Sequence, residues 1–130
     1  MLNYHLRGMT DDDLEFVYRA KKDAFKRYIV ENWGSWDETA QKEYFEHFLE
    51  DYRGNIQIIR ADNQNIGFVA AHIVGNGNYH IGTIVIIPEY QNHQIGTRII
   101  RDIIKRYGDK RNIEVKYFKK NPPINEQMIK

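Results

Sequence analysis

The fold is decided by the stretch Tyr79-His80-Ile81-Gly82-Thr83-Ile84-Val85-Ile86-Ile87-Pro88-Glu89-Tyr90-Gln91-Asn92-His93-Gln94-Ile95-Gly96-Thr97-Arg98-Ile99-Ile100-Arg101. A β-branched run from Ile81 to Ile87 stops at Pro88, and from Ile95 the apolar residues recur at the spacing of a helix. The stretch therefore predicts a strand, a tight loop and a helix N-terminus in direct succession. Such a junction presents unpaired N–H groups and the positive end of the helix dipole, which suits a phosphate or pyrophosphate.

The loop after this strand reads Gln91-Asn92-His93-Gln94-Ile95-Gly96-Thr97 and follows Pro88-Glu89-Tyr90. It resembles the cofactor-binding motif of the GCN5-related N-acetyltransferases (GNAT), which runs Gln/Arg-x-x-Gly-x-Gly/Ala. Gly96 occupies the second glycine position and Gln94 the first. Glycine serves at the first position because the backbone must approach a pyrophosphate closely or adopt a positive φ. Gln94 would fit if its φ is negative and its side chain points outward, and would weaken the site otherwise.

Patterns along the rest of the chain predict a single domain over residues 1–130. Strands are expected at 2–7, 56–61, 66–74, 81–87 and 113–118, and apolar helix faces at 14–29, 40–52 and 95–107. The residues Thr10 to Asp13 form a cap for the first helix, and Ser35 with Glu38 forms a capping box for the second. The turn formers of 62–65 predict a hairpin, and the last strand–helix–strand crossover predicts a parallel pair.

The predicted order βααβββαβ agrees with most of the GNAT fold. The resemblance therefore implies an α/β (α+β) acyl-CoA N-acyltransferase domain, with a mixed sheet and helices on both of its faces. The chain stops at Lys130, before the final hairpin of the family. We therefore expect a C-terminally short version of this fold.

Composition restricts the class of partner. The net charge of +1 gives no electrostatic reason to expect nucleic acid or a membrane surface. No apolar run approaches the roughly 20 residues that span a bilayer, and the first residues lack the apolar core of a signal peptide, so a cytoplasmic location is the default expectation. The chain has no cysteine, and its five histidines show no metal-ligand spacing, so neither a cysteine nucleophile nor a metal is expected.

The resemblance implies acetyl-CoA as the cosubstrate. Its pantetheine arm would bind the backbone of the strand before the loop as an added strand would, and its pyrophosphate would bind the N–H groups of the loop. After the last strand, Asn121-Pro122 resembles a family stretch whose asparagine helps to hold the arm. The cofactor-binding residues implied in this way are Ile84, Val85, Ile86, Gln91, Asn92, His93, Gln94, Ile95, Gly96, Thr97 and Asn121.

The implied reaction is direct transfer of acetyl to a primary amine of a small molecule or peptide, which must be neutral to attack the thioester. His80 is the candidate base because it lies on the strand that leads to the thioester, although strand alternation could turn it to the wrong face. Tyr28, Trp33 and Trp36, with the nearby Glu31, Asp37 and Glu38, would form an aromatic and acidic wall for a cationic acceptor. Alternatively, the tryptophans anchor the turn between the helices, and Asp37 and Glu38 serve the helix dipole.

The end of the chain keeps other functions open. The family often has a tyrosine seven residues after the asparagine, which protonates the leaving thiolate, but here Met128 occupies that position. Missing strands would leave the edge of the 113–118 strand unpaired, so we expect a homodimer to cover it. The alternative to an enzyme is a degenerate GNAT-like module that binds CoA without catalysis. A purely structural or protein-binding domain is the third reading.

Overall fold

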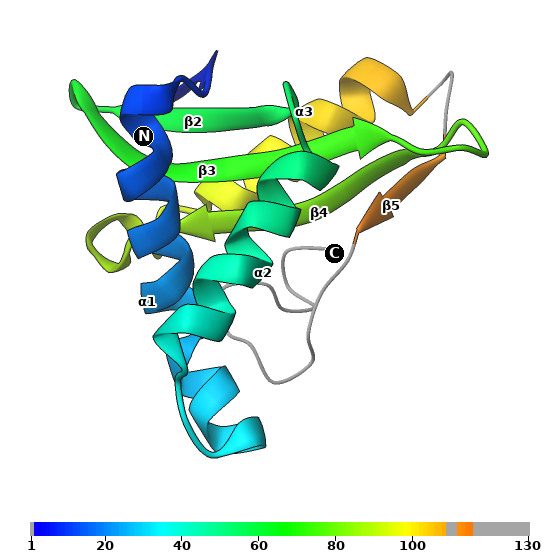
Figure 1. The fold of residues 1–130 in the computed structure, drawn as a ribbon. Coiled ribbons are helices and arrows are strands. Elements are labelled where there is room, and N and C mark those ends of the chain that lie inside the picture. The colour runs from blue at the N-terminus through cyan, green and yellow to red at the C-terminus, as the bar shows by residue number, and fades with distance from the viewer. Residues whose placement is uncertain (1, 109–111, 116–130) are drawn as a thin grey trace.

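A five-stranded sheet forms the centre of the molecule. The structure is a computed structural model and describes residues 2–108 and 112–115. The strands lie in chain order across the sheet (Figure 1), and they are β1 (His5–Gly8), β2 (Ile56–Ala61), β3 (Gln64–Ile73), β4 (Tyr79–Ile86) and β5 (Ile113–Val115). Neighbouring strands are antiparallel except for β4 and β5, which are parallel. The parallel pair that the crossover predicted is therefore confirmed.

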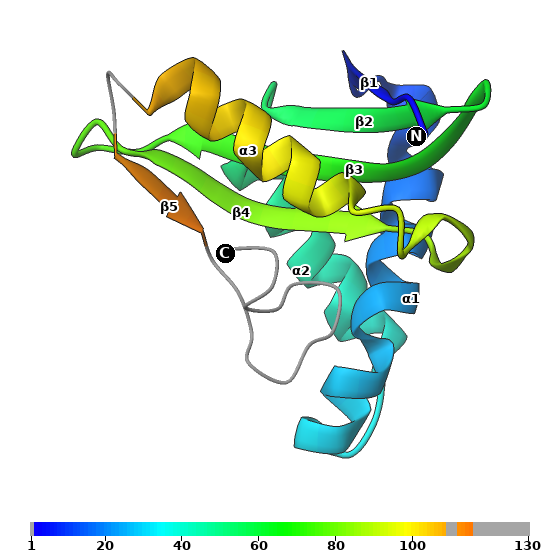
Figure 2. The same cartoon turned by 180° about the vertical axis from the view of Figure 1, so that it is seen from behind.

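Helices cover both faces of this sheet. The helices α1 (Leu14–Trp33) and α2 (Glu38–Asp51) lie over one face (Figure 1), and α3 (Ile95–Tyr107) lies over the other (Figure 2). Each face has its own buried core, one centred on Phe68 and Val17, the other on Ile59 and Ile99. The predicted order βααβββαβ and the mixed sheet with helices on both faces are confirmed. Residues 116–118 of the predicted last strand lie outside the described residues.

The hairpin between β2 and β3 closes over two residues, Asp62 and Asn63. Both have a positive φ, 53° and 63°, and Ala61 pairs with Gln64 across the turn. Two consecutive residues in the left-handed region match the twist of the flanking strands, and Asp and Asn tolerate that region better than most residues. The hairpin predicted from the turn formers of 62–65 is therefore confirmed.

The capping box predicted from Ser35 and Glu38 is wrong. The helix α2 begins at Glu38, so Ser35 lies too early to cap it. Asp37 is the N-cap instead, and its Oδ1 accepts a hydrogen bond from the N–H of Ala40 at 3.2 Å. The side chain of Glu38 turns toward α1, where it accepts a hydrogen bond from Tyr18.

The cap predicted at Thr10 to Asp13 forms a short turn of 3-10 helix at Asp11–Asp13 before α1. The sequence did not reveal that Asp13 is buried and paired with Arg7 from β1. Arg7 Nη1 and Nη2 donate to Asp13 Oδ2 and Oδ1, both at 2.8 Å, and the Thr10 N–H donates to Oδ2 at 2.9 Å. These hydrogen bonds, those from Arg7 first, hold the pKa of Asp13 well below its usual range. The pair attaches the start of α1 to the edge of the sheet.

A β-bulge interrupts the pairing of β3 with β4 at Gly82. Ala70 pairs with Thr83 and Ala71 with Ile81, which leaves Gly82 as the extra residue on β4. A bulge bends its strand and breaks the regular ladder, so the direction of β4 changes at this residue. The bulge therefore lies in the strand that leads to the loop before α3.

Candidate functional site

The loop between β4 and α3 contains two residues in the left-handed conformation that glycine adopts most easily. After the 3-10 turn Pro88–Tyr90, Asn92 and Gln94 adopt positive φ values of 72° and 58°. Gln91 Nε2 donates a hydrogen bond to the carbonyl of Ile86 at 2.9 Å, which ties the loop back to the end of β4. The loop therefore turns sharply and presents its backbone at the start of α3.

The N-terminus of α3 offers free donors. Its first intrahelical hydrogen bond runs from the Arg98 N–H to the Gln94 carbonyl at 2.9 Å. The N–H groups of Ile95, Gly96 and Thr97 therefore have no acceptor within the helix. The first turn of α3 carries no acidic residue. The positive end of the helix dipole is thus not neutralised by the helix itself, and an anion would be favoured there.

Gln94 does not have the negative φ that its fit was expected to require. Its φ of 58° lies in the left-handed region, which costs a non-glycine residue about 1 to 2 kcal/mol. The residue is exposed, so its side chain does lie outward. The turn therefore holds a glutamine in a conformation that glycine adopts without strain.

Replacing Gln94 with glycine should relieve this strain. We expect Gln94→Gly to raise the free energy of unfolding by about 0.5 to 1 kcal/mol, because the left-handed penalty disappears while the unfolded chain gains some freedom. Urea denaturation measures this change. As a control, Gln91→Gly alters a neighbour whose φ is −70°, so it should not stabilise the protein. A Gln94→Gly variant less stable than the wild type would contradict the strain argument.

Within the part of the chain that the structure describes, the edge of β4 that faces β5 is paired over three residues. Tyr79, His80 and Ile81 pair with Ile113, Glu114 and Val115, and in the described residues no strand pairs with this edge farther along β4. The side chains of Ile84, Val85 and Ile86 are buried, so only their backbone groups can serve a ligand. A ligand lying along this edge would run from the loop at Gln91–Thr97 toward the bulge at Gly82.

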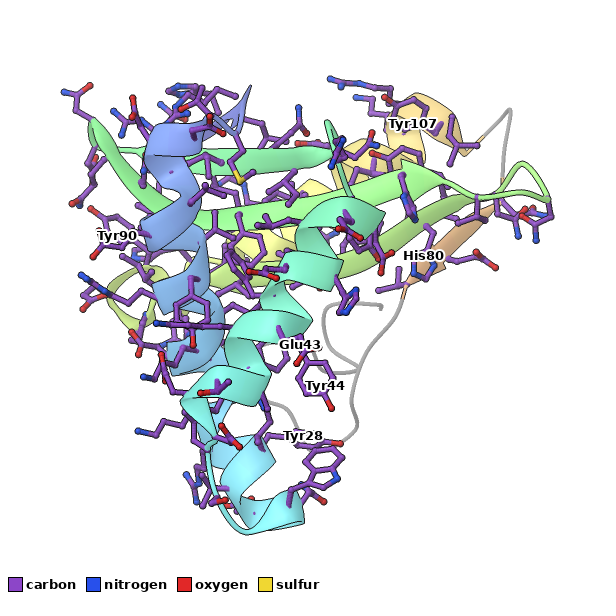
Figure 3. All side chains as sticks on the ribbon, viewed as in Figure 1. Tyr28, Glu43, Tyr44, His80, Tyr90 and Tyr107 are labelled. Atoms are coloured by element: carbon purple, nitrogen blue, oxygen red, sulfur yellow. The ribbon has the colours of Figure 1, made fainter. Side chains whose placement is uncertain are left out.

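A cavity of about 410 Å³ opens beside the bulge, between α1, α2 and β4. Its lining is rich in aromatic side chains, and Tyr28, Trp33 and Trp36, the three predicted acceptor residues, are all part of it. Tyr28 of α1 and Tyr44 of α2 both line the cavity and lie near one another in Figure 3. The lining also includes Lys22, Asp51, Tyr52, Gly82 and Thr83.

The three acidic residues of the predicted wall have partners within the chain, and Glu31 pairs with Arg27 at 2.9 Å. Glu38 accepts hydrogen bonds from Lys22 at 3.0 Å, from Tyr18 at 2.8 Å and from Trp36 Nε1 at 2.7 Å. These bonds, with that from Lys22 the strongest, lower the pKa of Glu38 to about 2. Asp37 caps α2, as the alternative of a role at the helix dipole anticipated. The cavity is therefore mainly aromatic, and Lys22 in its lining is paired with Glu38.

The two tryptophans differ. Trp36 is anchored through its hydrogen bond to Glu38, as expected of a residue that holds the turn between the helices. Trp33 is 69% exposed and touches the Tyr28 ring edge-on, with 5.9 Å between ring centroids, so it does not anchor this turn to the core. Trp33 is available to contact a ligand.

His80 lies at the opposite end of β4 from Tyr90 and the loop (Figure 3). Its Nδ1 is 3.5 Å from Glu114 Oε1 on β5. Its ring centroid is 6.0 Å from that of His72, and Tyr52 stacks on His72 at 4.4 Å. Since Tyr52 follows α2, His80 is on the sheet face that α2 covers, beside the cavity and not on the α3 face. Asn121 lies outside the described residues.

The family model of the Acetyltransferase (GNAT) family matches residues 14–130. The chain belongs to the GNAT acetyltransferase family. Several solved GNAT enzymes have the same fold. The PaiA N-acetyltransferase from Thermoplasma acidophilum, solved with coenzyme A, gives a TM-score of 0.63 at 17% identity, over 93% of this chain and 83% of that one. The aminoglycoside acetyltransferase AAC(6')-Iy, solved with a bisubstrate analogue, gives 0.58 at 18% identity, over 92% and 82%. No curated protein matches the sequence.

The fold class predicted from the sequence is therefore confirmed, and the chain is an acetyltransferase of this family. Coenzyme A is the ligand of related structures, which agrees with acetyl-CoA as the cosubstrate of this GNAT domain. Among residues 2–108 and 112–115, no helix combines the length and apolar character needed to cross a membrane.

Proposed function

We propose that this GNAT domain transfers acetyl from acetyl-CoA to a primary amine of a small molecule or peptide. One observation carries the proposal: the edge of β4, with which no strand of the described residues pairs beyond Ile81, joins a helix N-terminus that favours anions at one end to an aromatic cavity at the other. The helix N-terminus suits a pyrophosphate, and the edge of β4 suits an extended arm that contains amide groups. The cavity suits an acceptor.

The cosubstrate would be held mainly by the backbone. The N–H groups of residues 92–97 face the pyrophosphate in this proposal, and the Thr97 hydroxyl adds a donor. The backbone of Ile84, Val85 and Ile86 binds the arm. Arg98 is not part of the site, because its Nη1 donates to the Leu2 carbonyl at 2.5 Å and its guanidinium stacks on Tyr4.

The acceptor would enter the aromatic cavity, where Tyr28, Trp33 and Trp36 provide apolar contact area. A small-molecule amine agrees with the solved aminoglycoside acetyltransferase that shares the fold, and a peptide amine fits the open, exposed position of Trp33. Acetyl-CoA supplies an activated carbonyl carbon, and the acceptor nitrogen attacks it. His80 then accepts the proton that the nitrogen loses, either directly or through a water.

A binding measurement and an assay of CoA release test this proposal. We expect CoA and acetyl-CoA to bind the purified 130-residue chain in isothermal titration calorimetry, and free CoA to be released when an acceptor amine from a panel of polyamines, aminoglycosides, amino acids and peptides is added. A folded chain that binds neither ligand at millimolar concentration overturns the proposal. Binding without release of CoA to any amine favours the module that holds CoA without catalysis.

Two further expectations from the sequence remain proposals. A homodimer agrees with the 51% exposed Ile73 at the end of β3, and light scattering showing a stable monomer would refute it. A cytoplasmic location agrees with a chain that has no cysteine, and localisation of a tagged chain would test it.

A further inference from the structure

The hydroxyl of Tyr52 lies directly over the β-bulge of β4. A Cβ atom at Gly82 would be only 1.7 Å from Tyr52 Oη and 2.5 Å from its Cζ. The end of the tyrosine ring therefore occupies the space that glycine leaves at the extra residue of the bulge. Tyr52 and Gly82 both line the aromatic cavity beside Thr83.

Contacts on the ring hold Tyr52 in this place. It stacks on His72 at 4.4 Å and packs against Phe48 at 5.2 Å between ring centroids. The hydroxyl has no hydrogen bond to any other residue in the described part of the chain. Burial raises the pKa of the Tyr52 hydroxyl above its usual value, and the negative charge of Asp51 adds to this rise. Tyr52 thus carries a proton and an unused donor at the bulge.

The order of features along β4 connects this donor to the reaction. In the proposed function the arm of acetyl-CoA starts at the loop and runs past Ile86, Val85 and Ile84. The next residues along the strand are Thr83 and Gly82, so the thioester end of the arm comes to the bulge. We propose that Tyr52 is a catalytic residue that donates its hydroxyl proton to the sulfur of the leaving CoA.

This inference rests on the proposed function and adds the acid to it. The acceptor nitrogen forms a bond to the carbonyl carbon, the carbon–sulfur bond breaks, and its electron pair goes to sulfur. The Tyr52 hydroxyl gives its proton to that sulfur and becomes a phenolate. The proton lost by the acceptor nitrogen then returns to the phenolate through water or His80. The products are an amide and CoA with its thiol intact, and no further reagent is needed.

Binding of CoA and of desulfo-CoA, which lacks the thiol sulfur, tests the contact without turnover. A hydroxyl that donates to sulfur should favour the thiolate, so we expect the wild type to bind CoA more tightly than desulfo-CoA as the pH rises from 7 to 10. A charge-assisted hydrogen bond makes this preference about tenfold. Tyr52→Phe keeps the ring contacts and should abolish the preference, while binding desulfo-CoA as the wild type does.

A control variant and turnover complete the experiment. Tyr107→Phe removes a hydroxyl from the other sheet face, where Tyr107 stacks on Tyr79, and should behave as the wild type does. With an acceptor amine, Tyr52→Phe should lower kcat about 100-fold and leave KM for acetyl-CoA unchanged. If Tyr52→Phe retains the pH-dependent preference for CoA, the inference is wrong while the proposed function stands. If the wild type binds neither CoA nor desulfo-CoA, the proposed function fails, and the inference fails with it.

Discussion

Gly67→Ala is expected to lower the free energy of unfolding by about 3 kcal/mol, a large share of the roughly 5 to 15 kcal/mol that stabilises a typical domain. A Cβ atom at this position would be 2.1 Å from the carbonyl oxygen of Val85 and 3.2 Å from the Cα of Ile86. Both are backbone atoms of β4, so no side-chain rotation can relieve the clash. The two central strands, β3 and β4, would have to move apart where Gly67 pairs with Ile86.

Urea denaturation followed by circular dichroism measures this loss. Gly75→Ala is the matched control, because a Cβ atom there meets nothing within 4 Å. We expect the control to stay within about 0.5 kcal/mol of the wild type. Equal stability of the two variants would show that β3 and β4 do not approach each other as closely as the structure shows. Because the clash falls on Val85, Gly67→Ala should also weaken CoA binding if it folds.

Thr97→Asp is expected to abolish CoA binding without harming the fold. The new carboxylate would be in the first turn of α3, where the dipole favours negative charge and no acidic residue is present. It should therefore stabilise the helix by about 0.3 to 1 kcal/mol. The same charge would repel a pyrophosphate bound to the free N–H groups. At about 4 Å and an effective dielectric of about 20 the repulsion is about 4 kcal/mol, and salt screens part of it.

We therefore expect the affinity for CoA to fall at least about 100-fold, as measured by calorimetry at low and high salt. Thr97→Asn has nearly the same shape without the charge and should lose about tenfold at most. A melting temperature at or above that of the wild type would show that Thr97→Asp is folded. If the variant binds CoA as well as the wild type, the pyrophosphate does not lie at the start of α3.

The stretch from β4 to α3 shows how far the sequence alone could go. The switch from a strand pattern to a helix pattern predicted the topology around the loop, because burial of an apolar face determines both periods. The φ of Gln94 could not be predicted in the same way. Its left-handed conformation follows from the path that joins β4 to α3, and glutamine by itself favours a negative φ. Tertiary structure overrode the local preference at that residue.

Tertiary contacts also explain other features that the sequence did not predict. Asp13 was expected only as part of the cap of the first helix, yet it pairs with Arg7, which β1 brings close. Ser35 fits a capping pattern, but α2 starts after Asp37, and sequence patterns leave helix boundaries uncertain by a few residues. Tyr52 falls within the apolar face predicted for the second helix, and that prediction was sound. Its contact with Gly82 joins two residues far apart in sequence, and such contacts leave no local signal.

The contact between Tyr52 and Gly82 also has a consequence for how the protein could change. The two positions compete for the same space, because any side chain at position 82 would overlap with the Tyr52 hydroxyl. A substitution at 82 would therefore either displace the Tyr52 ring from the bulge or require a smaller residue at 52, and a chain that regained glycine would again have room for tyrosine. The two positions should evolve as a unit, and related sequences should show them changing together.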